Sequence, residues 1–217
     1  MLDMYAKRDI MVALVVASFI IGAVLWNYMP DRMASHWDIE GKVNGYSSKL
    51  VGLFLIPFTS MLLFLMYLAI PRIDPLRRNI AKFRPFFDTF MLVVMAFLIY
   101  IYLFTLAWNL GFRFNLTQVM VPGIAGLFYY SGILLENSRR NWFIGIRTPW
   151  TISSEKVWNR THKLGAGLFK ASAIISLAGI VFPSFAAWLL LGPVLASSVY
   201  LIAYSYVEYS RLHRKRR

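Results

Sequence analysis

The sequence contains no cysteine and few charged residues. Because none of its 217 residues is Cys, the chain can form no disulfide, has no thiol nucleophile and offers no thiolate to a metal. Only 15% of the residues are charged, and 10 acidic residues face 23 Lys and Arg, which gives a formal net charge of +13. A soluble nucleic-acid-binding domain would carry such a charge on a solvated face. No long segment here could supply that face, so we expect no direct contact with nucleic acid.

Apolar residues make up most of the chain. They account for 59% of it, and the mean hydropathy of +0.57 is high for a soluble domain. Six apolar stretches approach the roughly 20 residues that cross a bilayer as a helix. They span residues 10–26, 50–70, 87–108, 117–135, 164–182 and 185–206. Since backbone polar groups in lipid must be satisfied within their own segment, the sequence predicts an all-α integral membrane protein with about six transmembrane helices.

The distribution of Lys and Arg predicts the orientation of these helices. Basic residues gather before the first stretch, after the second, after the fourth and in the C-terminal tail. The other two links hold few of them: Arg32, Lys42, Lys49 and Arg113. Because basic loops tend to stay in the cytoplasm, we expect a multi-pass protein of the cell membrane with both termini cytoplasmic. Membrane lipids are then its first partners.

We divide the chain into three units by its apolar stretches and loops. Residues 1–70 form an N-terminal two-helix unit with a polar outer loop, and residues 71–135 hold two central helices. Residues 136–217 form a C-terminal unit with a second polar loop, two helices and the basic tail. The second loop is expected to face the cytoplasm.

The outer loop at 27–50 is dense in functional groups. Polar and apolar residues alternate over 36–40, which predicts a strand with His36, Asp38 and Glu40 on one face. Imidazole and carboxylate groups are good ligands for divalent metals, so these three residues form one candidate metal site. The alternatives are a hairpin that binds a peptide or another partner, and a purely structural lid. Neither alternative needs a cofactor.

A turn signal follows that strand. Asn44 and Gly45 both tolerate positive φ, which is typical of a tight hairpin turn. We therefore expect a short hairpin on the membrane surface, anchored by the aromatic rings of Trp37 and Tyr46. The candidate ligand- or partner-binding residues of this loop are His36, Trp37, Asp38, Asn44, Tyr46 and Lys49.

The second polar loop precedes the fifth apolar stretch. Pro149 should keep Thr148 extended, and Ser153 or Ser154 is a plausible N-cap for a short cytoplasmic interfacial helix. On that helix Glu155, Asn159 and His162 would share one face, while Val157, Trp158 and Thr161 lean to the other. Three tryptophans indicate a segment in the headgroup region: Trp142, Trp150 and Trp158.

Arg147 is central to the expected role of this loop. It could pair with Glu155. Its role could be to contact an anion, a peptide or a protein together with the face of Glu155 and His162, or to form an internal clasp that fixes the loop against the spans. No serine-type nucleophile motif accompanies His162, so we assign no catalytic residue. The candidate binding residues here are Asn141, Arg147, Trp150, Glu155, Trp158 and His162.

Few ionisable residues fall within the predicted spans. Lys170 lies near the start of the fifth, where its long stem could reach the cytoplasmic face, and Asp88 and Glu136 lie at span ends. No series of carboxylates crosses the bilayer, which argues against an ion-coupled pump.

The order of the two loops resembles the SdpI family of bacterial membrane proteins. The outer loop is similar to a domain of unknown function found at the N-terminus of that family, in a pattern that falls on Pro30, His36, Trp37, Gly41, Asn44, Gly45, Tyr46 and Lys49. The inner loop is similar to the C-terminal motif, on Asn141, Gly145, Arg147, Thr148, Pro149, Trp150, Thr151, Glu155, Trp158, Thr161 and His162.

The resemblance implies a non-enzymatic immunity or signalling protein. Such a protein would recognise a secreted peptide toxin outside the cell and engage a cytoplasmic transcriptional regulator. One alternative is a metal-dependent membrane hydrolase acting on peptide or lipid, which would need His36 and His162 near one metal. A second is a small-molecule transporter, which with six spans would need to form an oligomer.

Overall fold

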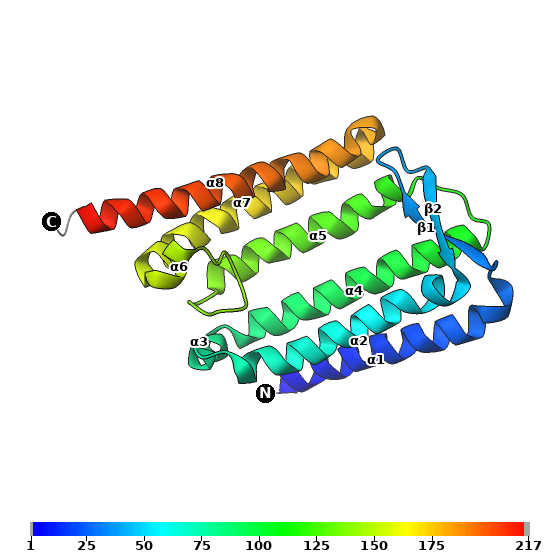
Figure 1. The fold of residues 1–217 in the computed structure, drawn as a ribbon, viewed down its shortest axis with the longest axis horizontal. Coiled ribbons are helices and arrows are strands. Elements are labelled where there is room, and N and C mark those ends of the chain that lie inside the picture. The colour runs from blue at the N-terminus through cyan, green and yellow to red at the C-terminus, as the bar shows by residue number, and fades with distance from the viewer. Residues whose placement is uncertain (1, 215–217) are drawn as a thin grey trace.

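Six long helices lie side by side in the computed structural model, which describes residues 2–214 (Figure 1). The long helices are α1 Leu2–Leu25, α2 Lys49–Ile73, α4 Arg84–Asn109, α5 Leu116–Asn137, α7 Glu155–Val181 and α8 Ala186–Arg214. Two short helices, α3 Arg77–Lys82 and α6 Pro149–Ser153, lie in the links. All six long helices are long and apolar enough to cross a membrane, which confirms the predicted all-α fold and its six spans.

The two polar loops lie at opposite ends of the helices (Figure 1). A β-hairpin of β1 Arg32–Trp37 and β2 Val43–Ser48 lies at one end, between α1 and α2 in sequence. The chain termini, α3 and α6 lie at the other end. The predicted separation of the two motif-rich segments by the length of the helices is therefore present in the fold.

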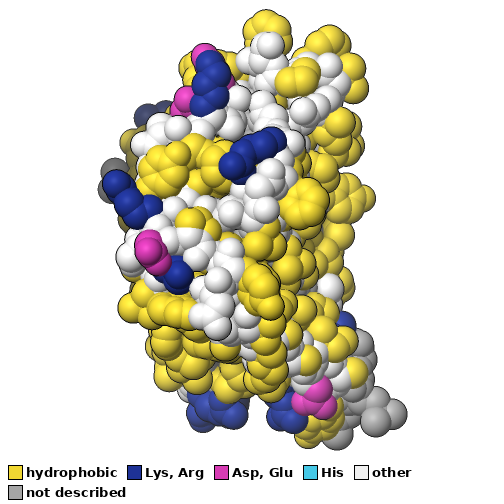
Figure 2. Space-filling view, turned by 90° about the vertical axis from the view of Figure 1, so that its right-hand side faces the viewer, with side chains coloured by type: hydrophobic (Ala, Val, Ile, Leu, Met, Phe, Trp, Pro, Cys, Tyr) yellow, Lys and Arg dark blue, Asp and Glu magenta, His cyan; other side chains and the backbone are white. Residues whose placement is uncertain are grey.

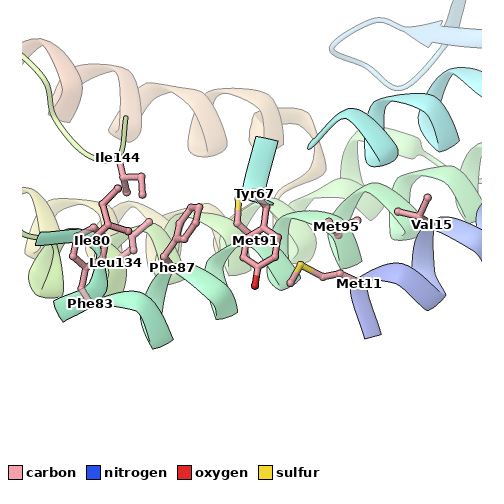
Figure 3. Packing of buried hydrophobic residues seen from close by; sticks show 10 residues of the cluster. All are labelled: Met11, Val15, Tyr67, Ile80, Phe83, Phe87, Met91, Met95, Leu134 and Ile144. Carbon is pink, nitrogen blue, oxygen red and sulfur yellow. The ribbon is translucent and has the colours of Figure 1, made fainter. Parts of the chain in front are cut away.

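Two helical groups meet along α4 and α5. The first contains α1, α2 and α4, and in the second α7 packs between α5 and α8. A cluster of buried side chains fills the first group, with Met11, Tyr67, Phe87 and Met95 among them, and it extends to Ile144 of the inner loop (Figure 3). The inner loop thus packs against the first group. Helix α5, which we placed in the central unit, has its most extensive contacts with α7.

The flanks of the bundle are apolar. Large hydrophobic side chains face outward along the long helices, such as Leu55 on α2 and Val199 on α8, which are 60% and 69% exposed. Seen from the hairpin end, charged and polar side chains gather on that end while hydrophobic ones cover the flank beside it (Figure 2). A lipid bilayer around the helices would cover this apolar surface.

The hairpin is built differently from the predicted one. β1 ends at Trp37, so Asp38 and Glu40 lie in the turn and not on a strand face. Gly41 has φ +80° and makes the turn, where a side chain would be strained. Asn44 and Gly45, predicted as the turn, lie within β2 instead. The prediction was wrong because the segment at Gly41 and the pair Asn44-Gly45 both carry turn signals. Only the pairing of the two strands decides which of them makes the turn.

Candidate functional site

The hairpin is fixed to the ends of α4 and α5. The Asn109 carboxamide accepts a hydrogen bond from the Ala34 backbone N–H at 2.8 Å and donates one to the Ala34 carbonyl at 3.1 Å, so it substitutes for a neighbouring strand. The ring of Trp37 packs edge-on against Trp108, with 5.8 Å between centroids. The Asn115 side chain donates to the Glu40 carbonyl at 2.9 Å. These contacts give the turn a defined place above the helices.

The three candidate metal ligands have other partners. His36 Nδ1 donates to the Asn44 carboxamide oxygen at 2.5 Å. Asp38 Oδ1 accepts from the backbone N–H groups of Glu40 and Lys42, which shapes the turn. Glu40 pairs with Lys42 at 2.7 Å, and this hydrogen bond raises the pKa of Lys42. Among the described residues no group of three His, Asp or Glu side chains could hold a metal ion.

The remaining predicted residues of the outer loop lie on two sides of the hairpin. Tyr46 is 54% exposed and lies under the guanidinium of Arg32, with 5.8 Å to the ring centroid. Lys49 pairs with Asp31 at 3.0 Å, at the start of α2. Only Tyr46 among these offers a broad free surface, while Trp37 is half-buried against the helices.

At the opposite end, a buried Trp–His stack holds the inner loop. Trp158 and His162 are one turn apart on α7, with ring centroids 3.9 Å apart and planes 15° apart. His162 Nδ1 donates to the Trp158 carbonyl at 2.9 Å, and its Nε2 accepts from the Ile146 backbone N–H at 3.0 Å. Both side chains are at most 2% exposed. His162 therefore has no ring nitrogen left for a ligand or a proton-transfer role.

This arrangement corrects two predictions. His162 shares the buried face of α7 with Trp158, while Glu155 and Asn159 are exposed on another face. Trp158 is fully buried within the protein, so its ring cannot contact lipid headgroups, whereas Trp142 is 51% exposed. Helical spacing placed Glu155, Asn159 and His162 near one another around α7, but it could not predict that the inner loop would cover His162 and leave the other two exposed.

Backbone hydrogen bonds to side chains shape the rest of the loop. The fully buried Asn141 accepts from the Phe143 and Ile144 N–H groups and donates to the Ile144 carbonyl. Arg147 is exposed and donates to the Trp142 carbonyl at 2.8 Å. In the described part of the chain Arg147 has no ion pair with Glu155, so the predicted pairing of these two side chains is absent.

The helix start after this loop agrees in part with prediction. Thr148 is extended before Pro149, as predicted, and its hydroxyl caps α6 in a capping box with Thr151. Ser154 caps the next helix, also as predicted. That helix is not a separate interfacial one, however, because α7 runs from Glu155 without a break into the apolar span. Trp150 lies on the one-turn helix α6, 5.1 Å from the ring of Tyr206 on α8.

Two buried acids near this end were not predicted from the sequence. Asp74 is 2% exposed, ends α2, and accepts from the backbone N–H groups of Leu76 and Trp142 at 2.6 and 2.9 Å. Glu208 on α8 is buried and paired with Arg160. The position of Asp74 just before Pro75 was the available signal, since it marks a helix end.

The charged residues that were predicted at the span ends are also paired. Asp88 is buried and receives a hydrogen bond from Arg84 at 2.5 Å, and Lys170 extends to Glu136 at 2.5 Å. Arg84 and Asp88 lie one turn apart on α4, while Lys170 on α7 pairs with Glu136 on α5. They provide no continuous polar path along the helices.

Fold and site together define a multispanning all-α membrane protein with a fixed hairpin at one end and a clasped motif loop at the other. Residues 137–205 match the model of the SdpI/YfhL protein family. Residues 13–61 match a domain of unknown function, DUF1648, which covers the second half of α1, the hairpin and the first half of α2. The two matched segments are those on which the resemblance was based.

A curated relative is similar along nearly the whole chain. It is "Immunity protein SdpI" of Bacillus subtilis (strain 168), 24% identical over 211 residues, which cover 97% of this chain and 99% of the relative. No solved structure matches this chain. The likeness therefore extends across both loops and all six helices.

Proposed function

We propose that this protein gives immunity to a secreted antimicrobial peptide, which it recognises at the hairpin end. The observation that carries the proposal is the likeness to an immunity protein over 97% of the chain. The hairpin end is proposed to face outward and both termini to face the cytoplasm, as the Lys and Arg distribution favours.

The surface at the hairpin end suits an amphipathic peptide. Exposed apolar or aromatic side chains there include Tyr28 at 72%, Ile39 at 64%, Tyr46 at 54% and Phe112 at 66%. Aromatic rings with a polar tip bind well at a membrane surface, where one side is apolar and the other wet. His36 is exposed beside Asn44 and adds polar contacts.

At the opposite end, the exposed residues are candidates for contact with a cytoplasmic regulator. Trp142, Arg147 and Glu155 are exposed, while Asn141, Trp158 and His162 are buried supports of the same loop. A partner would therefore contact Trp142, Arg147 and Glu155. It would depend on the three buried side chains only because they hold the shape of the loop.

Growth of a peptide-sensitive bacterial host tests the proposal. Cells that express the protein should grow at concentrations of a candidate membrane-active peptide that stop the parent strain. Tyr46→Ala should reduce protection about tenfold, because it removes an exposed aromatic contact. Tyr5→Ala is the matched control, since Tyr5 also lies under an arginine, Arg8, but on α1 at the opposite end.

Equal loss of protection in the two variants at equal expression would contradict recognition at the hairpin. An absence of protection against every secreted peptide that kills the host would contradict immunity itself.

A further inference from the structure

A cavity of about 430 Å³ lies beneath the hairpin, between the nearby ends of α2, α4 and α5. Its walls are mainly apolar and include Val51 and Leu55 of α2, Ile101 of α4 and Met120 of α5. The size is within the range of pockets that bind small molecules. The cavity is therefore large enough for a ligand and is built mostly from residues of the long apolar helices.

The roof of this cavity contains polar atoms without partners. Trp37 Nε1 and Ser47 Oγ are buried, and within the described part of the chain neither has a hydrogen-bond partner. Both residues line the cavity. A buried polar group that lacks a hydrogen bond costs free energy, so a ligand that offers an acceptor here would be stabilised.

The mouth of the cavity opens on the lipid-facing side. Val51 and Leu55 line the cavity and are 43% and 60% exposed. The apolar outer face of α2 continues from them to the exposed Phe58 and Leu62. Among the described residues, no Asp, Glu, Lys or Arg lines the cavity. A ligand can thus enter sideways from the bilayer, and nothing in the lining selects a charge.

We propose that this cavity binds an acyl chain of a membrane lipid, with its carbonyl oxygen accepting hydrogen bonds from Trp37 Nε1 and Ser47 Oγ. The apolar walls match the chain, and the two donors match the single polar group at its head. A peptide segment fits less well, because its backbone brings many polar groups that an apolar wall leaves unpaired. The acyl site is independent of peptide immunity.

Native mass spectrometry of the full-length protein in detergent tests the site. The probes are dioleoyl phosphatidylglycerol, dioleoyl phosphatidylcholine and oleic acid, each added to lipid-stripped protein. One molecule of either phospholipid should be retained to a similar extent, since the described lining has no Asp, Glu, Lys or Arg to favour one headgroup. Retention of oleic acid alone would also support the acyl site and would identify the free acid as its source.

Two pairs of variants locate the retained molecule. Val51→Trp should abolish retention by filling the cavity, while Val199→Trp adds the same bulk to the exposed face of α8 and should change nothing. Trp37→Phe keeps a ring against Trp108 but removes the donor, and should weaken retention about fivefold. Its control is Trp188→Phe, at a residue that is 70% exposed on α8.

Equal retention by Val51→Trp and Val199→Trp would overturn the proposal, as would retention of phosphatidylglycerol alone. Displacement of the bound lipid by an immunity-relevant peptide that itself fails to bind Val51→Trp would assign the cavity to the peptide instead. Loss of lipid retention with protection of growth intact would leave the immunity proposal standing.

Discussion

At the scale of the residue, Gly145 and His162 decide how closely the inner loop approaches α7. Gly145 has φ +114°, a conformation that L side chains rarely adopt, and an added Cβ would lie 2.4 Å from His162 Nε2. The same nitrogen accepts the Ile146 N–H at 3.0 Å. The loop can close over the imidazole only because the residue before Ile146 has no side chain.

Gly145→Ala should therefore destabilise the protein by about 2 kcal/mol, through backbone strain and displacement of the imidazole. Thermal unfolding in detergent, followed by the loss of soluble folded protein, measures the effect. Gly167→Ala is the matched control. Gly167 lies on α7, as His162 does, with open space around it and no positive φ. If the two variants unfold at the same temperature, the close approach is not important for stability.

At the scale of the element, the hairpin is supported by α4 as well as by its own pairing. Two strands of six residues are marginal alone in water. Asn109 bonds both backbone groups of Ala34, and Trp108 packs against Trp37, so the end of α4 acts as the missing neighbour. This attachment also holds the roof over the cavity between α2, α4 and α5.

Asn109→Ala should loosen the hairpin without unfolding the helices. Loss of the two hydrogen bonds to Ala34 should cost about 2 kcal/mol locally, which raises amide hydrogen exchange in β1 roughly thirtyfold. Hydrogen exchange with mass spectrometry measures it segment by segment. Asn137→Ala is the control, since its side chain bonds Ile133 in its own helix. Unchanged exchange in β1 would show that Asn109 does not hold the hairpin.

At the scale of the whole molecule, the two motif-rich segments are separated by the length of the helices (Figure 1). The metal-dependent hydrolase considered above would need His36 and His162 near one metal, and the fold places them at opposite ends. The transporter alternative stays a prediction. This separation fits the proposed immunity protein, which would bind a peptide at the hairpin end and contact a partner at the end with the inner loop.

Labelling of single cysteines in intact cells tests the orientation. Because the natural chain has no Cys, Lys42→Cys in the hairpin turn and Lys156→Cys at the start of α7 each give one thiol, both at exposed positions. A membrane-impermeant maleimide should label Lys42→Cys from outside and label Lys156→Cys only after the cells are opened. Labelling of both thiols in intact cells would contradict opposite sides, and the reverse pattern would contradict the proposed orientation.

Local signals explain what the sequence predicted well. The six spans were found because their length and hydropathy are imposed by the bilayer. The observed helix ends lie within three residues of the predicted ones, except that α1 and α7 begin and α8 ends eight or nine residues further out. The extended Thr148 and the cap at Ser154 follow from chemistry within four residues. The family resemblance also rested on motifs that can be read along the chain.

Only the tertiary structure decided the roles of the motif residues. Pairing of β1 with β2 sets the hairpin register, so Gly41 makes the turn and Asn44 lies in a strand. Packing of the inner loop onto α7 buries Trp158 and His162. The sequence by itself determined a membrane protein of six helices, because hydropathy is a property of each segment alone. Burial and register depend on contacts between segments far apart in the chain, and those contacts exist only in the folded molecule.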